Sequence, residues 1–191
     1  MDCNTLVIIG ASTGGPRTLR ELLAKLPVLD ACLLIIQHLP THIAPSISKS
    51  LQRVTSMPVK LAEHGGPLKS GEILLAPGDI HTELECNQSI RLVEGEKVNF
   101  VRPSIDVAMK SLKSEPPCKF IGVILTGMGK DGVAGISHIK QLGGTTIAQD
   151  GASSVVFGMP KAAAATGDID FVLSPERIGD KITELVQSWS S

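Results

Sequence analysis

Three polar side chains in this sequence come shortly after apolar runs. Ser12 follows the run at 6–9, His38 follows the run at 32–36, and Asp131 lies in the segment after the run at 120–125. A serine hydroxyl is a weak nucleophile until an imidazole takes its proton, and a carboxylate keeps that imidazole in the required tautomer. The three residue types are therefore the parts of a serine hydrolase triad, provided that the fold brings them together.

The residues around Ser12 are suited to acyl transfer. Glycines flank the serine in the segment Gly-Ala-Ser-Thr-Gly-Gly-Pro, and they permit a tight turn whose backbone N–H groups face the reaction centre. A helix predicted from about Pro16 would add positive potential for an oxyanion at its N-terminal end. The turn, together with His38 and Asp131, predicts ester hydrolysis through a covalent acyl intermediate.

Each of the three residues also has a purely structural interpretation. Taken alone, Ser12 is expected to be a turn serine or a helix-capping serine. His38 could bond a backbone carbonyl at the end of a strand, and Asp131 could cap the helix that follows it. The catalytic hypothesis therefore depends on the joint placement of the three side chains.

The apolar runs before these residues predict buried strands joined by helices. The runs at 6–9 and 32–36 are separated by an amphipathic segment with leucines at 19, 22, 23 and 26, which predicts strand, helix, strand. Segments 120–125, 133–142 and 145–149 repeat this unit, and a last strand at 169–173 precedes a helix capped at Ser174. We expect a doubly wound, mainly parallel, Rossmann-like α/β sheet with helices on both faces.

The middle third of the chain has a different pattern. Short strand candidates at 59–62, 72–76 and 90–93 are separated by Gly-Gly-Pro, Pro-Gly-Asp and Asn-Gln-Ser turn signals, which predict a small antiparallel hairpin region. Ser104 is expected to cap a short helix that runs to about Leu112. Ligands of open parallel sheets bind outside the carboxyl ends of the strands, so we expect the functional site there.

Composition favours one soluble catalytic domain over residues 1–191. Of the 191 residues, 42% are hydrophobic, which is enough for one core. Lys+Arg total 18 and Asp+Glu total 19 in scattered positions, so we expect neither nucleic acid nor an anionic membrane as a partner. The apolar runs are far shorter than the roughly 20 residues of a membrane-spanning helix. Four widely spaced cysteines and an N-terminus unlike a signal peptide predict a cytoplasmic protein.

The chain resembles a known family along nearly its whole length. The motifs that carry the resemblance are Ile-Gly-Ala-Ser-Thr-Gly-Gly-Pro from Ile9, Gln-His at 37 and 38, Ala-Pro-Gly from Ala76 followed by His81, Pro-Ser-Ile-Asp from Pro103, Leu-Thr-Gly-Met-Gly-x-Asp-Gly from Leu125 and Val-x-Gly-Met-Pro-Lys-Ala-Ala from Val156. In this order they are similar to the catalytic domain of the chemotaxis protein-glutamate methylesterases. The combination is highly specific.

The resemblance implies a role for each candidate residue. Ser12 would be the nucleophile, His38 the general base and then the acid, and Asp131 the carboxylate that orients the imidazole. Thr13 and Met128 would contribute to the oxyanion environment. The implied substrate is a glutamate γ-methyl ester on a cytoplasmic chemoreceptor helix, which yields methanol and glutamate, and some members also deamidate glutamine. No cofactor and no metal is implied.

The resemblance also bears on regulation. Family members usually carry an N-terminal receiver domain whose phosphorylation relieves inhibition, and residues 1–191 contain no such domain. We therefore expect either an isolated catalytic domain or a stand-alone member, with a separate receiver protein or domain as a further candidate partner.

Dinucleotide binding is the strongest rival hypothesis. Gly127, Gly129 and Gly132 fit the pattern G-x-G-x-x-G between a predicted strand and a predicted helix. Asp150 ends the next strand, where an acid that binds the ribose belongs. Against this hypothesis, Asp131 inside the turn would bring a carboxylate close to a pyrophosphate, and the Ser12 and His38 loops would have no purpose.

A P-loop, a metal site and a cysteine nucleophile are weaker hypotheses. Pro16 and Arg17 occupy the positions where a P-loop needs Lys and Ser or Thr. Pro40 stands between His38 and His42 and argues against the helix that would align them as metal ligands. Cys32 opens a predicted buried strand, which disfavours it as a nucleophile. A non-catalytic module that binds receptor helices without turnover stays open as a hypothesis.

Overall fold

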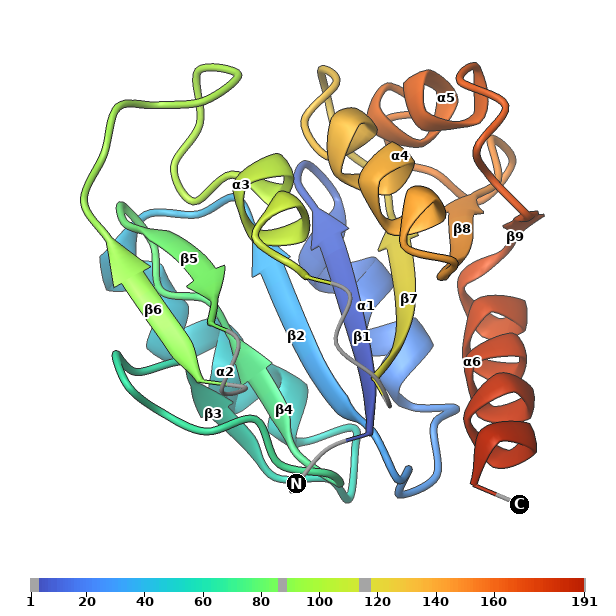
Figure 1. Cartoon of the computed structure of the whole chain (residues 1–191), viewed down its shortest axis with the longest axis horizontal. Helices are drawn as coiled ribbons and strands as arrows, with labels where there is room; N and C mark the ends of the chain where they lie inside the picture. The colour runs from blue at the N-terminus through green and yellow to red at the C-terminus, as the bar shows by residue number, and fades with distance from the viewer. Residues whose placement is uncertain (1–3, 86–88, 114–117, 191) are drawn as a thin grey trace.

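The fold is organised around a seven-stranded parallel sheet. A computed structural model describes residues 4–85, 89–113 and 118–190. The strands of the sheet are β1 (Thr5–Ala11), β2 (Cys32–Gln37), β3 (Val59–Leu61), β4 (Ile73–Leu75), β7 (Lys119–Ile124), β8 (Thr145–Gln149) and β9 (Phe171–Leu173). Their order is β3-β4-β2-β1-β7-β8-β9, and all neighbouring pairs are parallel. The carboxyl ends of the strands therefore lie along one edge of the sheet (Figure 1).

Helices cover both faces of this sheet, as predicted (Figure 1). One face carries α1 (Gly15–Leu23), α2 (Ala44–Gln52) and α6 (Pro175–Trp189), and the other carries α3 (Ile105–Lys110), α4 (Val133–Gln141) and α5 (Met159–Ala164). A single turn of 3-10 helix, η1 (Thr41–Ile43), leads into α2. Since α1 follows β1 on one face and α4 follows β7 on the other, the sheet is doubly wound.

The continuous apolar runs are explained by burial on both faces. In β1, Leu6 and Ile8 belong to the hydrophobic cluster that includes residues of α3 and α4, whereas Val7 and Ile9 belong to the cluster that includes residues of α1 and α6. Successive side chains of a strand point to opposite faces, so a strand covered on both sides needs apolar residues at every position. This confirms the parallel α/β class predicted from the sequence.

The middle third contains the predicted small antiparallel region, but two of the three expected strands belong to the main sheet instead. The candidates at 59–62 and 72–76 are β3 and β4, which extend the main sheet next to β2 in parallel and form no hairpin. The antiparallel pair consists of β5 (His81–Leu84), which the sequence did not predict, and β6 (Ile90–Val93). All three residues of β4 are buried, because it lies inside the sheet between β3 and β2.

Two short helices were also missed, for an identifiable reason. In α2 only Ala44 and Leu51 are buried, so its apolar stripe is too sparse to show a helical period. Helix α5 has six residues, fewer than two turns. Cys3, Cys86 and the Asn-Gln of the turn signal at 87–88 lie outside the described residues. Within the described ranges, no helix is long and apolar enough to cross a bilayer.

Candidate active site

The register of β1 and β2 brings Ser12 and His38 together. Ala11 pairs with Gln37 at the ends of these strands, and the His38 N–H donates to the Ala11 carbonyl at 3.0 Å. The side-chain amide nitrogen of the buried Gln37 donates to the carbonyl oxygens of both Ser12 and His38, each at 3.0 Å. The two candidate residues therefore leave the sheet side by side, with their backbones joined by one amide.

The turn that carries Ser12 is fixed by hydrogen bonds on both sides. Its N–H donates to the Thr126 carbonyl at 3.0 Å, and its carbonyl accepts from the Gly15 N–H at 2.8 Å, where α1 begins. The buried Thr126 hydroxyl donates to the Thr13 carbonyl at 2.9 Å. The loops after β1 and β7 are thus bonded to each other at the point where the strand order reverses, which is where open α/β sheets bind ligands.

Asp131 reaches His38 from the loop after β7. Its Oδ2 lies 2.8 Å from Nε2 of His38, whose side chain is 11% exposed. An ionised carboxylate can only accept, so Nε2 carries the proton in this contact, and Nδ1 is left as the basic nitrogen of the neutral ring. A histidine held in this way has the tautomer that a general base requires.

Asp131 is held by a dense set of donors. Its Oδ1 accepts from the Ser104 hydroxyl at 2.7 Å, the Asn99 amide at 3.1 Å and the Asp106 N–H at 3.2 Å, while Oδ2 also accepts from the Ile105 N–H at 2.6 Å. Burial alone would raise the pKa of Asp131, but the hydrogen bonds from His38 and from these donors keep it below its usual value. Asp131 is therefore a carboxylate at neutral pH.

The residues that surround Asp131 had no predicted role in the site, although Ser104 was correctly predicted to cap α3. Nδ1 of the buried His81 accepts from the Ser104 N–H at 3.2 Å, and its Nε2 donates to the Glu96 carbonyl at 2.9 Å. The buried Asp106 accepts from the Gly135 N–H at 2.7 Å. His81, Ser104 and Asp106 stand in the motifs that resemble the family, which was a signal for them. Asn99 stands in none of those motifs.

The two oxyanion candidates occupy the loops that flank the triad candidates. Thr13 is exposed and directly follows Ser12, and Met128 is 75% exposed in the loop that carries Asp131. Both residues therefore lie beyond the carboxyl ends of β1 and β7, at the same edge of the sheet as the triad candidates. Their contribution to an oxyanion site stays a prediction.

The groups required for dinucleotide binding are engaged within the protein. The Gly127 N–H donates to the Val156 carbonyl at 3.0 Å, and the Asp150 carboxylate accepts from the N–H and hydroxyl of Ser153 at 2.9 and 2.6 Å. Asp131, inside the same glycine pattern, faces His38. These contacts argue against a pyrophosphate in the turn and a ribose at Asp150.

Comparison with known proteins gives a consistent result. A family model described as CheB methylesterase matches residues 7–182. The protein-glutamate methylesterase/protein-glutamine glutaminase of Pyrococcus horikoshii is 40% identical over 185 residues, covering 95% of this chain and 50% of that protein. The protein of the same name from Sulfurimonas denitrificans is 41% identical over 186 residues, covering 96% and 53%. This chain thus spans about half the length of these relatives.

A solved structure matches at the same level. The crystal structure of the Thermotoga maritima CheB methylesterase catalytic domain superposes with a TM-score of 0.89 at 40% identity, covering 95% of this chain and 98% of that one. The match over the whole domain confirms the resemblance that the sequence motifs indicated. This chain belongs to the CheB methylesterase family.

Proposed function

We propose that this chain hydrolyses γ-methyl esters of glutamate side chains in proteins, with Ser12, His38 and Asp131 as its catalytic triad. The observation that carries the proposal is the hydrogen bond of 2.8 Å between His38 and Asp131, at strand ends beside the Ser12 turn. The name that the relatives share, protein-glutamate methylesterase/protein-glutamine glutaminase, supports the substrate class.

In the proposed mechanism, Nδ1 of His38 takes the proton as Ser12 Oγ attacks the ester carbonyl. The tetrahedral intermediate collapses when His38 returns the proton to the leaving methoxide, and methanol departs from a glutamyl ester of Ser12. Water then attacks this ester with His38 again as the base, which frees the glutamate and Ser12. Backbone N–H groups of Thr13 and Met128, with the N-terminal end of α1, would stabilise each oxyanion.

The same site would deamidate glutamine. The acyl intermediate is identical, and ammonia leaves in place of methanol once His38 has protonated it. The double name of the relatives supports this second activity. We expect it to be slower, because an amide is a poorer acylating group than an ester.

Exposed apolar side chains near the triad support a protein substrate. Phe100 is 95% exposed and follows Asn99, which bonds Asp131, while Met128 is 75% exposed three residues before Asp131. Exposed apolar side chains close to a functional site are typical of surfaces that bind other proteins. Methylated cytoplasmic helices of chemoreceptors are the proposed partner, as the family resemblance implies.

The direct test is release of methanol from a methylated receptor fragment. Wild-type protein should release it, and Ser12→Ala should abolish measurable release while the thermal unfolding midpoint stays close to that of the wild type. Ser188→Ala is a matched control, since its hydroxyl bonds the Leu185 carbonyl in α6, far from the triad candidates. Release by Ser12→Ala at the wild-type rate would refute the serine mechanism.

The two rival hypotheses give different results. In the methanol assay, a non-catalytic binding module would retain methylated receptor without releasing methanol from it. A dinucleotide-binding domain would give heat of binding with NAD in calorimetry, and we expect none.

A further inference from the structure

The side-chain amide of Asn99 lies between two buried carboxylates, those of Asp106 and Asp131. Asn99 belongs to a turn that is far in sequence from the triad candidates. Nδ2 of Asn99 lies 2.8 Å from Oδ2 of Asp106 and 3.1 Å from Oδ1 of Asp131. A primary amide nitrogen has two hydrogens, so it can donate one to each carboxylate. The half-buried Asn99 thus links the carboxylate that orients His38 to a second acid that does not contact His38.

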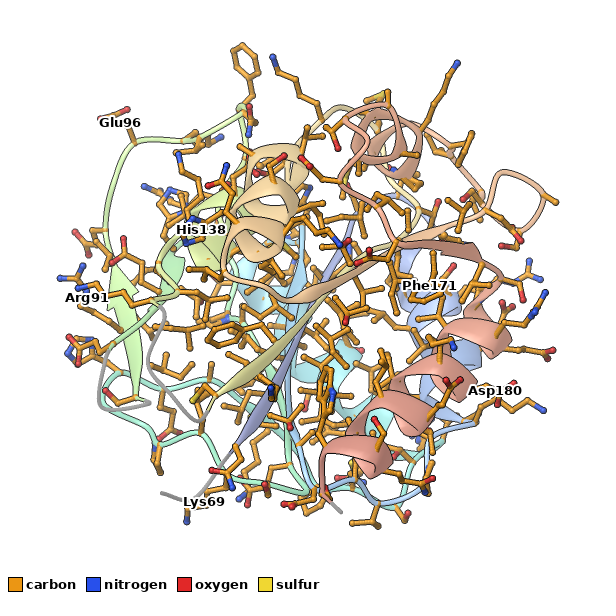
Figure 2. The ribbon with its side chains drawn as sticks, turned by 45° about the vertical axis from the view of Figure 1, so that its right-hand side comes forward. Lys69, Arg91, Glu96, His138, Phe171 and Asp180 are labelled. Carbon is orange, nitrogen blue, oxygen red and sulfur yellow. The ribbon has the colours of Figure 1, made fainter. Side chains whose placement is uncertain are left out.

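The segment around Asn99 is fixed at several points. Val98 and Val101 exchange backbone hydrogen bonds of 3.2 and 3.1 Å across Asn99 and Phe100, which both have positive φ angles, 53° and 67°. This is the backbone of a two-residue turn in which asparagine is favoured at the first position. Upstream, the Glu96 carbonyl accepts from a buried histidine, and Figure 2 shows Glu96 on the loop that leads from β6 towards α3. The turn therefore fixes the backbone of Asn99 so that its side chain points towards Asp106 and Asp131.

The two carboxylates need a donor between them. Asp106 and Asp131 are 7% and 3% exposed, and burial together with the charge of Asp131 keeps the pKa of Asp106 above its usual value. The Gly135 N–H fixes Oδ1 of Asp106, which leaves Oδ2 for Asn99. An amide donor that contacts both acids lowers their repulsion and limits rotation of Asp131 about its last side-chain bond.

We propose that Asn99, anchored by Asp106, is a positioning residue that holds Oδ1 of Asp131 so that Oδ2 stays directed at Nε2 of His38. This inference rests on the proposed function for its kinetic consequences, but the geometry it concerns exists without substrate. Asn99 acts through Asp131 and does not contact the reacting atoms.

The kinetic test compares variants at positions 99 and 106 with a remote control. Asn99→Ala should lower kcat and leave KM unchanged. The expected loss is roughly 10- to 100-fold, the size seen when a hydrogen bond that orients a metal-ligating residue is removed. Gln52→Ala is the matched control, because the Gln52 amide also donates twice, to the Thr55 and Met57 carbonyls at 3.2 Å, at the far end of α2. It should lower the unfolding midpoint and leave kcat at the wild-type value.

An exchange of the two side chains separates the contact to Asp106 from the contact to Asp131. The double variant Asn99→Asp with Asp106→Asn keeps the total charge and the pairing between 99 and 106, but it turns a carboxylate towards Asp131. We expect kcat to stay as low as in Asn99→Asp alone. Recovery of kcat to the wild-type value in the double variant would overturn the proposal, because only the pairing between 99 and 106 would then matter.

A spectroscopic measurement tests the same geometry without turnover. The Nε2 proton of His38, bonded to Asp131, should give a low-field proton resonance in wild-type protein and in Gln52→Ala. Asn99→Ala should broaden or shift it. An unchanged resonance in Asn99→Ala overturns the proposal whether or not the wild type releases methanol, whereas absent methanol release with a shifted resonance refutes only the proposed function.

Discussion

The α-carbon of Gly15 faces the side-chain oxygen of Gln37 so closely that no β-carbon fits between them. A β-carbon built on Gly15 would lie 1.9 Å from Oε1 of Gln37. The same Gln37 side chain donates to the carbonyls of Ser12 and His38. The absence of a side chain at Gly15 therefore determines how the backbones of Ser12 and His38, the proposed nucleophile and base, are held relative to each other.

Gly15→Ala should impair catalysis by displacing Gln37. The amide would lose its two hydrogen bonds, each worth about 1 kcal/mol of stability, and the Ser12 and His38 backbones would separate. Gln37→Ala removes the same bonds without the overlap, so both single variants should lower kcat. The double variant should have a kcat no lower than the less active single variant, because the two changes act on one contact. Measured kcat values that fall additively would show that Gly15 acts in another way.

Asp131→Asn should lower both turnover and stability. Backbone N–H groups donate to both oxygens of Asp131, from Asp106 to Oδ1 and from Ile105 to Oδ2, so an amide NH₂ meets a donor in either orientation. Misdirection of His38 should lower kcat by about 10⁴-fold, as in other serine triads. The unpaired donors should cost about 1–3 kcal/mol in urea unfolding.

A suitable control for that variant is Asp170→Asn. Asp170 accepts from the N–H and hydroxyl of Thr146 at 2.9 and 3.0 Å. Thr146 is near the N-terminal end of β8, whereas the triad candidates lie beyond the carboxyl ends of the strands. Its variant should lose stability and keep kcat. If Asp131→Asn keeps the wild-type kcat, Asp131 is a structural cap for α3 and no part of a triad.

Acid denaturation should depend on Asp131 and Asp106 in opposite directions. The pKa of Asp131 in the folded protein lies below its ordinary value, so its contribution to stability is present above that ordinary value and is lost as pH falls through the folded pKa. The pKa of Asp106 is raised, so its contribution is fully present below the ordinary value and is lost as pH rises through the folded pKa. Asp106 thus offsets part of the acid-induced loss due to Asp131.

The measurement is the free energy of unfolding between about pH 6 and about pH 3. Asp131→Asn should flatten its decline relative to the wild type, and Asp106→Asn should steepen it. Parallel profiles for all three proteins would contradict both assignments.

His81→Phe should destabilise the segment that holds Asp131. It removes the acceptor for the N–H of the buried Ser104 and the donor to the Glu96 carbonyl, which lies in a part-buried contact. One buried unpaired donor costs about 1–3 kcal/mol, which urea unfolding would measure. His138→Phe is the comparison, since His138 lies on α4 and its Nε2 bonds the Leu112 carbonyl at 2.9 Å (Figure 2). His81→Phe should lower kcat and His138→Phe should not.

Much of the framework could be read from local pattern. The run at 6–9 and the Gly-Ala-Ser-Thr-Gly-Gly-Pro segment predict strand, turn and helix, because burial on both faces requires continuous apolar residues and a tight turn requires glycine. The same logic predicted β2, β7 and β8 and led to Ser12, His38 and Asp131 as residues at strand ends. The antiparallel region of the middle third was predicted correctly, but two of its expected strands were not, because the short runs at 59–62 and 72–76 carry no information about which neighbour they pair with. In the structure these two runs pair in parallel with each other, and the second also pairs in parallel with β2.

Which chemical groups follow the buried strands can be read from the amino-acid sequence alone, because the period of apolar residues is a local property of the chain. The surroundings of Asp131, in contrast, depend on how distant segments of the folded chain pack together. Asn99, Ser104 and the N–H of Ile105 approach it from a turn and a helix end remote in sequence, and their hydrogen bonds of 2.6 to 3.1 Å depend on how those segments pack against β7 and α4. Hydrogen bonding needs distances and angles between such segments, and no local pattern encodes them.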